Sequence, residues 1–379
     1  MKQIKIVTVV GTRPEIIRLS SVINRLNASA FIDHTLIHTG QNYDKNLNDI
    51  FFNDLEIKKP DFYLDAAKGN PIQTIGEILI KIDPLLEEIN PDAILILGDT
   101  NSCLSAIVAK KKKIPIFHFE AGNRCFDFRV PEETNRRLVD HISDINLTYS
   151  SNASNNLLNE GLPSDRIIKV GSPMYEVISK NIGKIKKSKV LDKLKLEKQR
   201  YFLISCHREE NIDDLNNFNK LINSLNSISD LYSLPIIFPV HPRTKKIIDK
   251  NKPKLNDLIK LIDPLGFIDY NQLQINSNVV LSDSGTISEE SSILNFRAIN
   301  IRETHERHEA MEESTVIMTG LDSTRIIQGI EALKDQKTLN ERNIFQVPDY
   351  KVPNVSIKIE RIILSYINYV NRVVWQKES

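Results

Sequence analysis

The sequence predicts an α/β fold with two Rossmann-like, doubly wound domains that face each other across a cleft. Short apolar runs rich in Ile and Val alternate with amphipathic stretches from end to end. The 379 residues also exceed what one hydrophobic core usually organises. Strands that are buried on both faces and separated by helices form parallel sheets. Because the runs are too many for one open sheet, we divide them between two sheets.

The predicted strands follow one another along the chain with helical stretches such as "SAIVAKKKK" and "NFNKLINSLNSI" between them. They comprise residues 4–10, 34–40, 93–98, 114–119, 145–150, 166–171, 201–206, 235–241, 258–263, 279–283 and 298–302. The first domain is predicted to span residues 1–175 and the second residues 176–355. We interpret the basic segment 180–200 as a solvated linker plus a surface helix. Residues 356–379 begin with an amphipathic helix that is expected to pack back on the first domain.

Composition excludes several classes of partner. The net charge of +1 gives no reason to expect binding to nucleic acid or to an anionic membrane. No apolar stretch approaches the ~18 residues that a membrane span needs. The N-terminal apolar run breaks at Gly11 and indicates a first strand rather than a signal peptide. The three dispersed cysteines, Cys103, Cys125 and Cys206, favour a reducing compartment, so we expect a cytoplasmic protein.

The first predicted strand is followed by the turn "VVGTRPEIIR". Thr12 and Glu15 have capping-box spacing, and Pro14 stands where a first helical turn tolerates proline. The helix start therefore offers backbone amides to an anion, and Arg13 and Arg18 add positive charge. The alternative is a well-capped helix without a ligand. No G-x-G-x-x-G pattern follows this or any other strand, so no dinucleotide cofactor is expected.

Carboxylates follow the next strands of the same domain. Asp99 stands in "GDTNS", and Glu120 directly follows "IPIFHF". In "VPEETNRR" the helix is predicted to begin at Pro131, which places Glu132 and Arg136 on one face. Helix capping by Asp99 and a surface ladder of ion pairs are the structural alternatives. We favour catalysis because all these carboxylates follow adjacent strand ends, where they can act as general acids and bases.

The second domain carries basic residues and a polar turn after its strands. "LISCHREEN" contributes His207, and "FPVHPRT" contributes a second histidine at the next strand end, without the spacing of a metal site. In "LSDSGTISEESSIL", Ser284 and Gly285 precede a helix whose N-terminus can bind a phosphate. Glu290 lies one turn into that helix and is placed to accept hydrogen bonds from ribose hydroxyls.

A set of short motifs occurs in a fixed order along nearly the whole chain: "GTRPE", "GDT", "EAG", "PEE-NR", "CHRE", "PVH", "SDSG-I-EE" and "ER-EA". In order and spacing they resemble the non-hydrolysing UDP-N-acetylglucosamine 2-epimerase family. The resemblance implies two domains of the glycosyltransferase-B type that bind a UDP-sugar in their cleft. It also implies a homodimer that uses neither a cofactor nor a metal.

The resemblance also implies roles for individual residues. Those expected in catalysis are Asp99, Glu120, Glu132 and His207. Those expected to bind UDP or to line the catalytic cleft are Arg13, Arg18, Arg136, Ser284, Gly285, Glu290 and Arg307. Arg18 stands where lysine is more usual, Thr286 where glycine is common and His308 where proline is common. "NRCFDFRV" is shorter than the corresponding loop of the enzymes that act on UDP-N-acetylglucosamine.

Within the family, the stretch "EAGNRCFDFRVPEETNRRLVDHISDINLTYS" is most similar to the branch that forms UDP-N-acetyl-L-fucosamine for capsule and O-antigen. The branch inverts C2 of UDP-2-acetamido-2,6-dideoxy-L-talose, by eliminating UDP to a glycal and adding it back. A 2-epimerase acting on UDP-N-acetylglucosamine remains the first alternative. A glycosyltransferase of the same fold would keep the nucleotide site and need an acceptor groove. A silent UDP-sugar-binding regulator could lose the carboxylates, and the presence of all three argues against it.

Overall fold

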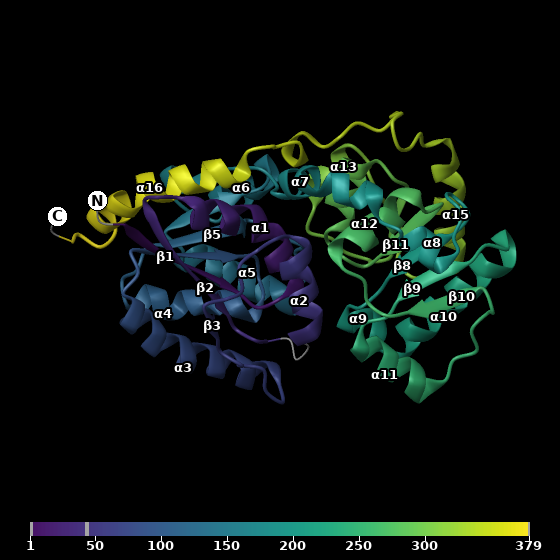
Figure 1. The fold of residues 1–379 in the computed structure, drawn as a ribbon, viewed down its shortest axis with the longest axis horizontal. Coiled ribbons are helices and arrows are strands. Elements are labelled where there is room, and N and C mark those ends of the chain that lie inside the picture. Colours follow the sequence, from purple (N-terminus) through teal and green to yellow (C-terminus); the bar gives the residue numbers. More distant parts are fainter. Residues whose placement is uncertain (1–2, 42–44, 378–379) are drawn as a thin grey trace. The chain divides into compact units, whose positions relative to one another are not determined.

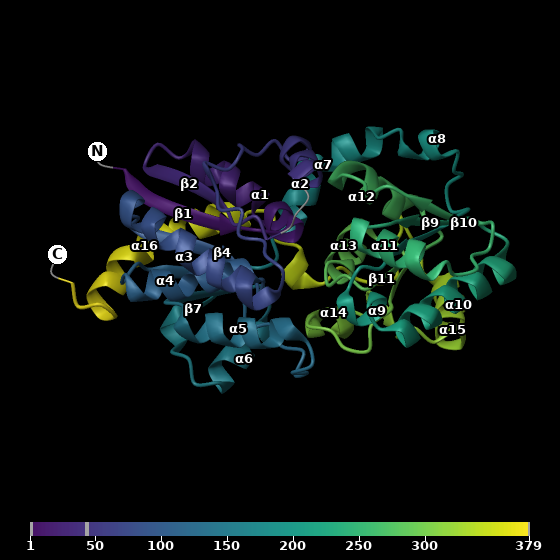
Figure 2. The same cartoon turned by 90° about the horizontal axis from the view of Figure 1, so that it is seen from below.

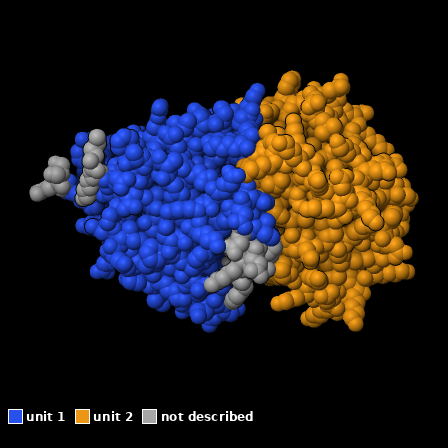
Figure 3. Space-filling model, viewed as in Figure 1, with its two compact units in different colours: residues 1–180, 349–379 blue, residues 181–348 orange. Residues whose placement is uncertain are grey.

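The computed structural model describes residues 3–41 and 45–377 and contains two compact units. Unit 1 comprises Met1–Lys180 and Asp349–Ser379, and unit 2 comprises Asn181–Pro348 (Figure 3). The boundaries therefore lie at residues 180 and 348 rather than at the predicted 175 and 355.

The predicted linker at residues 180–200 is largely helical. Helix α7 continues to Lys187, and α8 spans Val190–Leu194. Ile185, Val190 and Leu191 are buried, so the lysines around them occupy only the exposed positions of amphipathic helices. The surface helix predicted here is present, but the linker part of the prediction is wrong because the many lysines masked the apolar residues that are buried.

Unit 1 contains a seven-stranded parallel sheet in the order β3-β2-β1-β4-β5-β6-β7. Its strands are β1 Ile4–Val10, β2 Ile32–His38, β3 Phe62–Tyr63, β4 Ala93–Leu97, β5 Ile116–Ala121, β6 Ile145–Thr148 and β7 Ile167–Lys169. Its helices are α1 Arg13–Ala28, α2 Lys45–Asp54, α3 Pro71–Ile89, η1 Asn101–Ser105, α4 Ala106–Lys111, α5 Pro131–Ile142, α6 Ser151–Asn159, η2 Ser164–Arg166 and α16 Val355–Val373, together with α7 Met174–Lys187, which extends into unit 2.

Helices cover both faces of this sheet. α1 and α16 lie over one face, and α3 and α4 lie over the other (Figures 1 and 2). Alternate strand residues point to opposite faces, and Val7 and Val9 therefore pack with Ile78 and Ile82 of α3. α16 contacts α1 through an Arg25–Glu360 ion pair of 2.6 Å.

Unit 2 contains a six-stranded parallel sheet in the order β10-β9-β8-β11-β12-β13. Its strands are β8 Phe202–Ser205, β9 Ile236–Pro239, β10 Ile259–Ile262, β11 Val279–Ser282, β12 Ala298–Asn300 and β13 Ile317–Met318. Its helices are α8, α9 Glu209–Ile212, α10 Leu215–Tyr232, α11 Pro242–Asn251, α12 Phe267–Asn276, α13 Ile287–Leu294, α14 His308–Glu312, α15 Ser323–Ala332 and η3 Leu333–Asp335, and η4 Pro348–Tyr350 begins at its end.

The two faces of this second sheet form separate cores. Phe202 and Ile204 pack with residues of α10 and α15, whereas Tyr201 and Leu203 pack with residues of α8, α12 and α13. This alternation explains why the strands read as continuous apolar runs. The predicted fold of two parallel-sheet α/β domains is thus confirmed. The strands that the prediction missed, β3 and β13, have two residues each and are too short to give a periodic signal.

Each sheet has one point at which the strand order reverses. In unit 1 it lies between β1 and β4, and in unit 2 between β8 and β11. Open α/β sheets bind ligands beyond the carboxyl ends of the strands at such points. None of the helices within residues 3–41 and 45–377 has the length and apolarity needed to cross a bilayer.

Candidate active site

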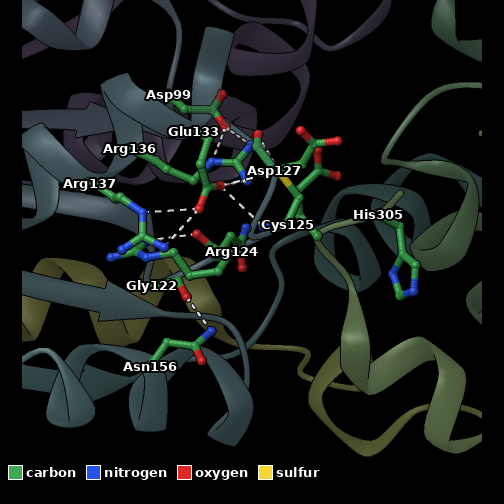
Figure 4. Close-up of polar contacts among 12 residues, drawn as sticks. Asp99, Gly122, Arg124, Cys125, Asp127, Glu133, Arg136, Arg137, Asn156 and His305 are labelled. Atoms are coloured by element: carbon green, nitrogen blue, oxygen red, sulfur yellow. Dashed lines mark hydrogen bonds and ion pairs between the residues drawn. The ribbon is translucent and has the colours of Figure 1, made fainter. Parts of the chain in front are cut away.

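Asp99 lies at the carboxyl end of β4, next to the reversal point of the first sheet. Arg136 of α5 donates from both Nε and Nη2 to Asp99 Oδ2, at 3.0 and 2.6 Å (Figure 4). Asn135 Nδ2 donates to the backbone carbonyl of Asp99 at 3.0 Å. The α5 helix begins at Pro131 as predicted, which directs these side chains toward the end of β4. Arg136, expected to line the site, is buried and holds a carboxylate expected to be catalytic.

Glu120 lies at the end of β5 in a left-handed backbone conformation with φ of 68°. The pairing of β5 with β6 shifts register between Phe119 and Ala121, so Glu120 sits in a bulge that re-aims its side chain. Its Oε2 accepts from Arg18 Nη1 at 2.9 Å and from the Tyr149 hydroxyl at 3.1 Å. A non-glycine residue in this conformation is costly and is typical of functional sites.

Two adjacent glutamates begin α5, and they differ in burial. Glu132 is partly exposed in the first turn, whereas Glu133 is fully buried. Glu133 accepts from Arg136 Nη1 and from Arg137 Nε, each at 3.1 Å, and from the Cys125 amide at the same distance. Glu133 therefore forms its ion pairs from a buried position. A surface ladder of ion pairs, one of the alternatives for this segment, is wrong for Glu133.

A buried ion-pair network anchors the loop between β5 and α5. The Arg124 side chain has no solvent exposure; its Nη1 donates to Asp140 at 2.7 Å, and its Nη2 donates to Glu160 at 2.6 Å. The Gly122 amide donates to Asp140 at 3.2 Å, and the Gly122 carbonyl accepts from Asn156 at 2.9 Å (Figure 4). Arg124 and Glu133 therefore hold the loop to α5 and to the end of α6.

Glu15 joins the two loops at the reversal point of the first sheet. Its Oε2 accepts from the Gly11 amide at 3.0 Å and from the Thr12 hydroxyl at 2.7 Å, and its Oε1 accepts from the Thr100 hydroxyl at 3.0 Å. The predicted capping box is only half formed because Thr12 donates to Glu15 instead of capping the helix. Burial raises the pKa of Glu15 to about 7, against the lowering effect of these hydrogen bonds.

This raised pKa predicts that folding stability falls with pH. Between about 4.5 and about 7 the folded protein keeps the Glu15 proton that the unfolded chain has lost, so the free energy of unfolding decreases by up to about 3 kcal/mol. Glu15→Gln does not titrate. In urea unfolding at a series of pH values, the stability of this variant relative to wild type should therefore rise across that window. A difference that is independent of pH would contradict the assignment.

The remaining expected residue at the first βα turn is Arg13, at the start of α1. Its side chain is partly exposed, and its guanidinium carbon lies 5.9 Å from the centre of the Phe51 ring. Arg18, which we had grouped with it as a source of positive charge for an anion, is instead 3% exposed and paired with Glu120.

In unit 2, His207 follows β8, and its imidazole Nδ1 lies 3.4 Å from Asp283 Oδ1. The His207 side chain is 43% exposed, while the Asp283 side chain is fully buried directly after β11. The backbone pairing of Ser205 with Ser282 brings the two residues together across the reversal point of this sheet. Sequence reasoning had missed Asp283 because the order of the strands could not be deduced from the chain.

Ser284 and Gly285 form the predicted polar turn between β11 and α13. The Ser284 hydroxyl lies 3.0 Å from that of Thr286 and accepts from the Thr286 amide at 3.3 Å. A Cβ added to Gly285 would approach only Glu306 Oε2, at 3.7 Å, so the backbone here is open to close approach. Together with the start of α13, this turn offers backbone amides to a phosphate.

Glu290 and Arg307 lie near this turn and are both buried. Glu290 Oε2 accepts from Gln274 Nε2 at 2.6 Å. Arg307 Nη2 lies 3.4 Å from Glu289. The neighbouring Arg302 and Glu306 pair through two contacts of 3.0 Å. The residues expected to bind UDP within unit 2 thus follow β11 and β12, on the carboxyl side of the sheet.

The structure therefore gathers Asp99, Glu120 and Arg136 with Arg18 in unit 1, and His207 with Ser284 and Gly285 in unit 2. The model of the family described as UDP-N-acetylglucosamine 2-epimerase matches residues 24–364. The chain belongs to this family. Its members named as 2-epimerases are isomerases, and the family assignment agrees with the motif resemblance.

Individual relatives match over most of their length. A UDP-N-acetylglucosamine 2-epimerase of Methanococcus maripaludis is 40% identical over 87% of this chain and 91% of its own. The solved UDP-N-acetylglucosamine 2-epimerase of Rickettsia bellii is 48% identical over 99% of this chain and 100% of its own, with a TM-score of 0.92. The Methanocaldococcus jannaschii UDP-GlcNAc 2-epimerase, solved with UDP-GlcNAc and UDP, is 35% identical over 96% of this chain and 100% of its own, with a TM-score of 0.88.

A more distant likeness concerns the fold alone. The glycotransferase of kitacinnamycin is 9% identical and has a TM-score of 0.59 over 96% of this chain and 100% of its own. The glycosyltransferase-B type of the two domains is therefore shared with a protein outside the epimerase family.

Proposed function

We propose that this protein inverts C2 of a UDP-2-acetamido sugar by eliminating UDP and adding it back. In the first step the C1–O bond breaks with its electron pair going to UDP, the C2 proton passes to a carboxylate, and a C1=C2 double bond forms. In the second step UDP adds to C1 while a proton reaches C2 from the opposite face. The C2 proton is barely acidic because no carbonyl stands next to it, so departure of UDP has to assist its removal.

The observation that carries the proposal is the pair of carboxylates at the ends of β4 and β5. Asp99 and Glu120 follow neighbouring strands, and each is held by a buried arginine. An arginine partner fixes the orientation of a carboxylate, and a general base must be held within hydrogen-bond reach of the proton that it removes. Glu132, partly exposed on α5, is the third candidate acid or base. In unit 2 we assign the diphosphate and ribose to Ser284, Gly285, Glu290 and Arg307, with Arg13 of unit 1 as a further charge for the phosphates.

For the sugar we propose UDP-2-acetamido-2,6-dideoxy-L-talose, converted to UDP-N-acetyl-L-fucosamine for a bacterial surface polysaccharide. The short loop between β5 and α5 exposes two aromatic rings: Phe126 is 63% exposed and Phe128 is 70% exposed. Neither ring therefore anchors the loop in the hydrophobic core. Exposed apolar side chains suit the C6 methyl group of a 6-deoxy sugar better than a hydroxymethyl group, which needs a hydrogen-bonding partner.

UDP-N-acetylglucosamine is the second candidate substrate. The relatives named above, at 35 to 48% identity, are described as enzymes of this sugar nucleotide. An apolar pocket rejects a hydroxylated analogue by only about 100-fold, so a trace of activity on it is expected in either case.

Two measurements on one preparation test the proposal. Incubation with a UDP-sugar in deuterated water and without an acceptor should place deuterium at C2, which NMR detects; a glycosyltransferase would leave C2 protonated. We then expect a higher kcat/KM for the 6-deoxy-L-talo substrate than for UDP-N-acetylglucosamine. Deuterium at C2 combined with the reverse preference would keep the epimerase and replace its substrate. No deuterium with either sugar would overturn the proposed reaction.

A further inference from the structure

Asp283, directly after β11, accepts several hydrogen bonds from the segment that follows β8. It is fully buried and accepts from the backbone amides of His207 and Arg208, each with a contact of 3.0 Å. The thiol of Cys206 at 3.1 Å and the side-chain amide of Asn211 at 3.2 Å complete the set. Every one of these donors belongs to residues 206–211, which connect β8 to α10.

We propose that Asp283 is the positioning residue of His207. It fixes the backbone of the loop and the imidazole ring, so that Nδ1 carries a proton toward the carboxylate and Nε2 is the nitrogen that exchanges protons. The kinetic part of this inference rests on the proposed function, because it assumes that His207 takes part in the reaction. The orientation of the ring can be measured without any substrate.

The geometry supports an ionised carboxylate at this position. Burial raises the pKa of Asp283, but the His207 charge, the Arg208 amide and the Cys206 thiol together outweigh it and lower the pKa. A negative charge 3.4 Å from Nδ1 favours a proton on that nitrogen. In hydrolases that use a Ser-His-Asp triad, the buried aspartate selects the histidine tautomer in the same way, and its loss costs about 10⁴-fold in turnover.

The position of Asp283 in the sheet gives the inference a second basis. Asp283 joins β11 to the loop after β8, across the point at which the strand order reverses. In unit 1 a carboxylate of α1, Glu15, likewise joins the loops after β1 and β4. Each sheet therefore uses one buried carboxylate to hold together the two loops at which an open α/β sheet binds its ligand.

A purely structural role would also explain so many hydrogen bonds, so the test needs a matched control. Asp283→Asn keeps the size of the side chain and removes its charge. Cys206→Ala removes one donor to the same carboxylate and leaves the charge in place. Both variants should be compared with wild type in kcat, in KM, in the pH profile of kcat and in thermal melting.

We expect Asp283→Asn to lower kcat by at least ~10-fold and to shift the pH profile of kcat. Cys206→Ala should keep the kcat and the pH profile of wild type. By NMR of ring-labelled histidine, with the His207 resonance assigned from His207→Gln, the His207 pKa should fall by about 1 unit in Asp283→Asn. In the wild-type protein the neutral His207 ring should carry its proton on Nδ1. This measurement does not depend on whether a variant folds.

A neutral His207 protonated on Nε2, or an Asp283→Asn enzyme with the kcat and pH profile of wild type, would overturn the inference. Equal losses in Asp283→Asn and Cys206→Ala would also do so, since they would indicate a structural role alone. If wild type places no deuterium at C2 of any UDP-sugar, the proposed function fails, and the NMR measurements alone decide the role of Asp283.

Discussion

Replacing Asp99, Glu120 or Glu132 with its amide lowers turnover by ~100-fold or more, the scale expected when a positioned acid or base is lost. An amide has nearly the shape of the carboxylate but cannot take up the C2 proton. The affinity for UDP should change little, because we assign the nucleotide to other residues. Turnover is measured by deuterium incorporation at C2, and UDP affinity by calorimetry.

Glu87→Gln provides the control for these variants. The Glu87 side chain is 77% exposed on α3 and pairs with Lys112. Its replacement makes the same chemical change far from the ends of β4 and β5 and should leave turnover unchanged. Near-normal turnover in all three site variants would refute the assignment of the carboxylates, even if the protein proves to be an epimerase.

The second large effect concerns stability. Arg124→Ala should lower the free energy of unfolding by about 3–5 kcal/mol, because it leaves the fully buried Asp140 carboxylate without its arginine partner. Arg124 also lowers the pKa of Glu160 to about 2 through its hydrogen bonds. Once Glu160 is protonated, its ion pair with Arg124 no longer stabilises the folded state. The free energy of unfolding should therefore decline as the pH falls from above 4.5 toward 2. Urea unfolding at neutral pH measures the main effect.

Arg129→Ala is the matched control because it removes an arginine of the same loop. The Arg129 side chain is 81% exposed and pairs with Asp127 at 2.7 Å. Exposed ion pairs contribute little, so this variant should unfold close to wild type. If both variants were equally stable, the network around Arg124 would not anchor the loop.

The position of the candidate site at strand ends could be predicted from the sequence, but the partners of its residues could not. "GDT" and "EAG" place Asp99 and Glu120 directly after apolar runs, and that pattern sufficed to select them. Their partners Arg136 and Arg18 are 37 and 102 residues away in the chain. The sequence identified both arginines only as charges near a ligand. Their pairing depends on the order of the strands and on the angle at which each helix crosses the sheet.

By itself the sequence determined the class of fold and the set of polar residues at its strand ends. The period of apolar residues distinguishes strands from helices, and strands buried on both faces have few alternatives to a parallel sheet. Only the tertiary structure decided which polar residues serve the fold. Glu15, Glu133 and Asp283 look like ordinary surface residues in the sequence, yet all are buried. The reversal of strand order brings Glu15 and Asp283 to donors 85 and 77 residues away, whereas the donors of Glu133 lie within eight residues of it. A buried polar group is tolerable only with such donors.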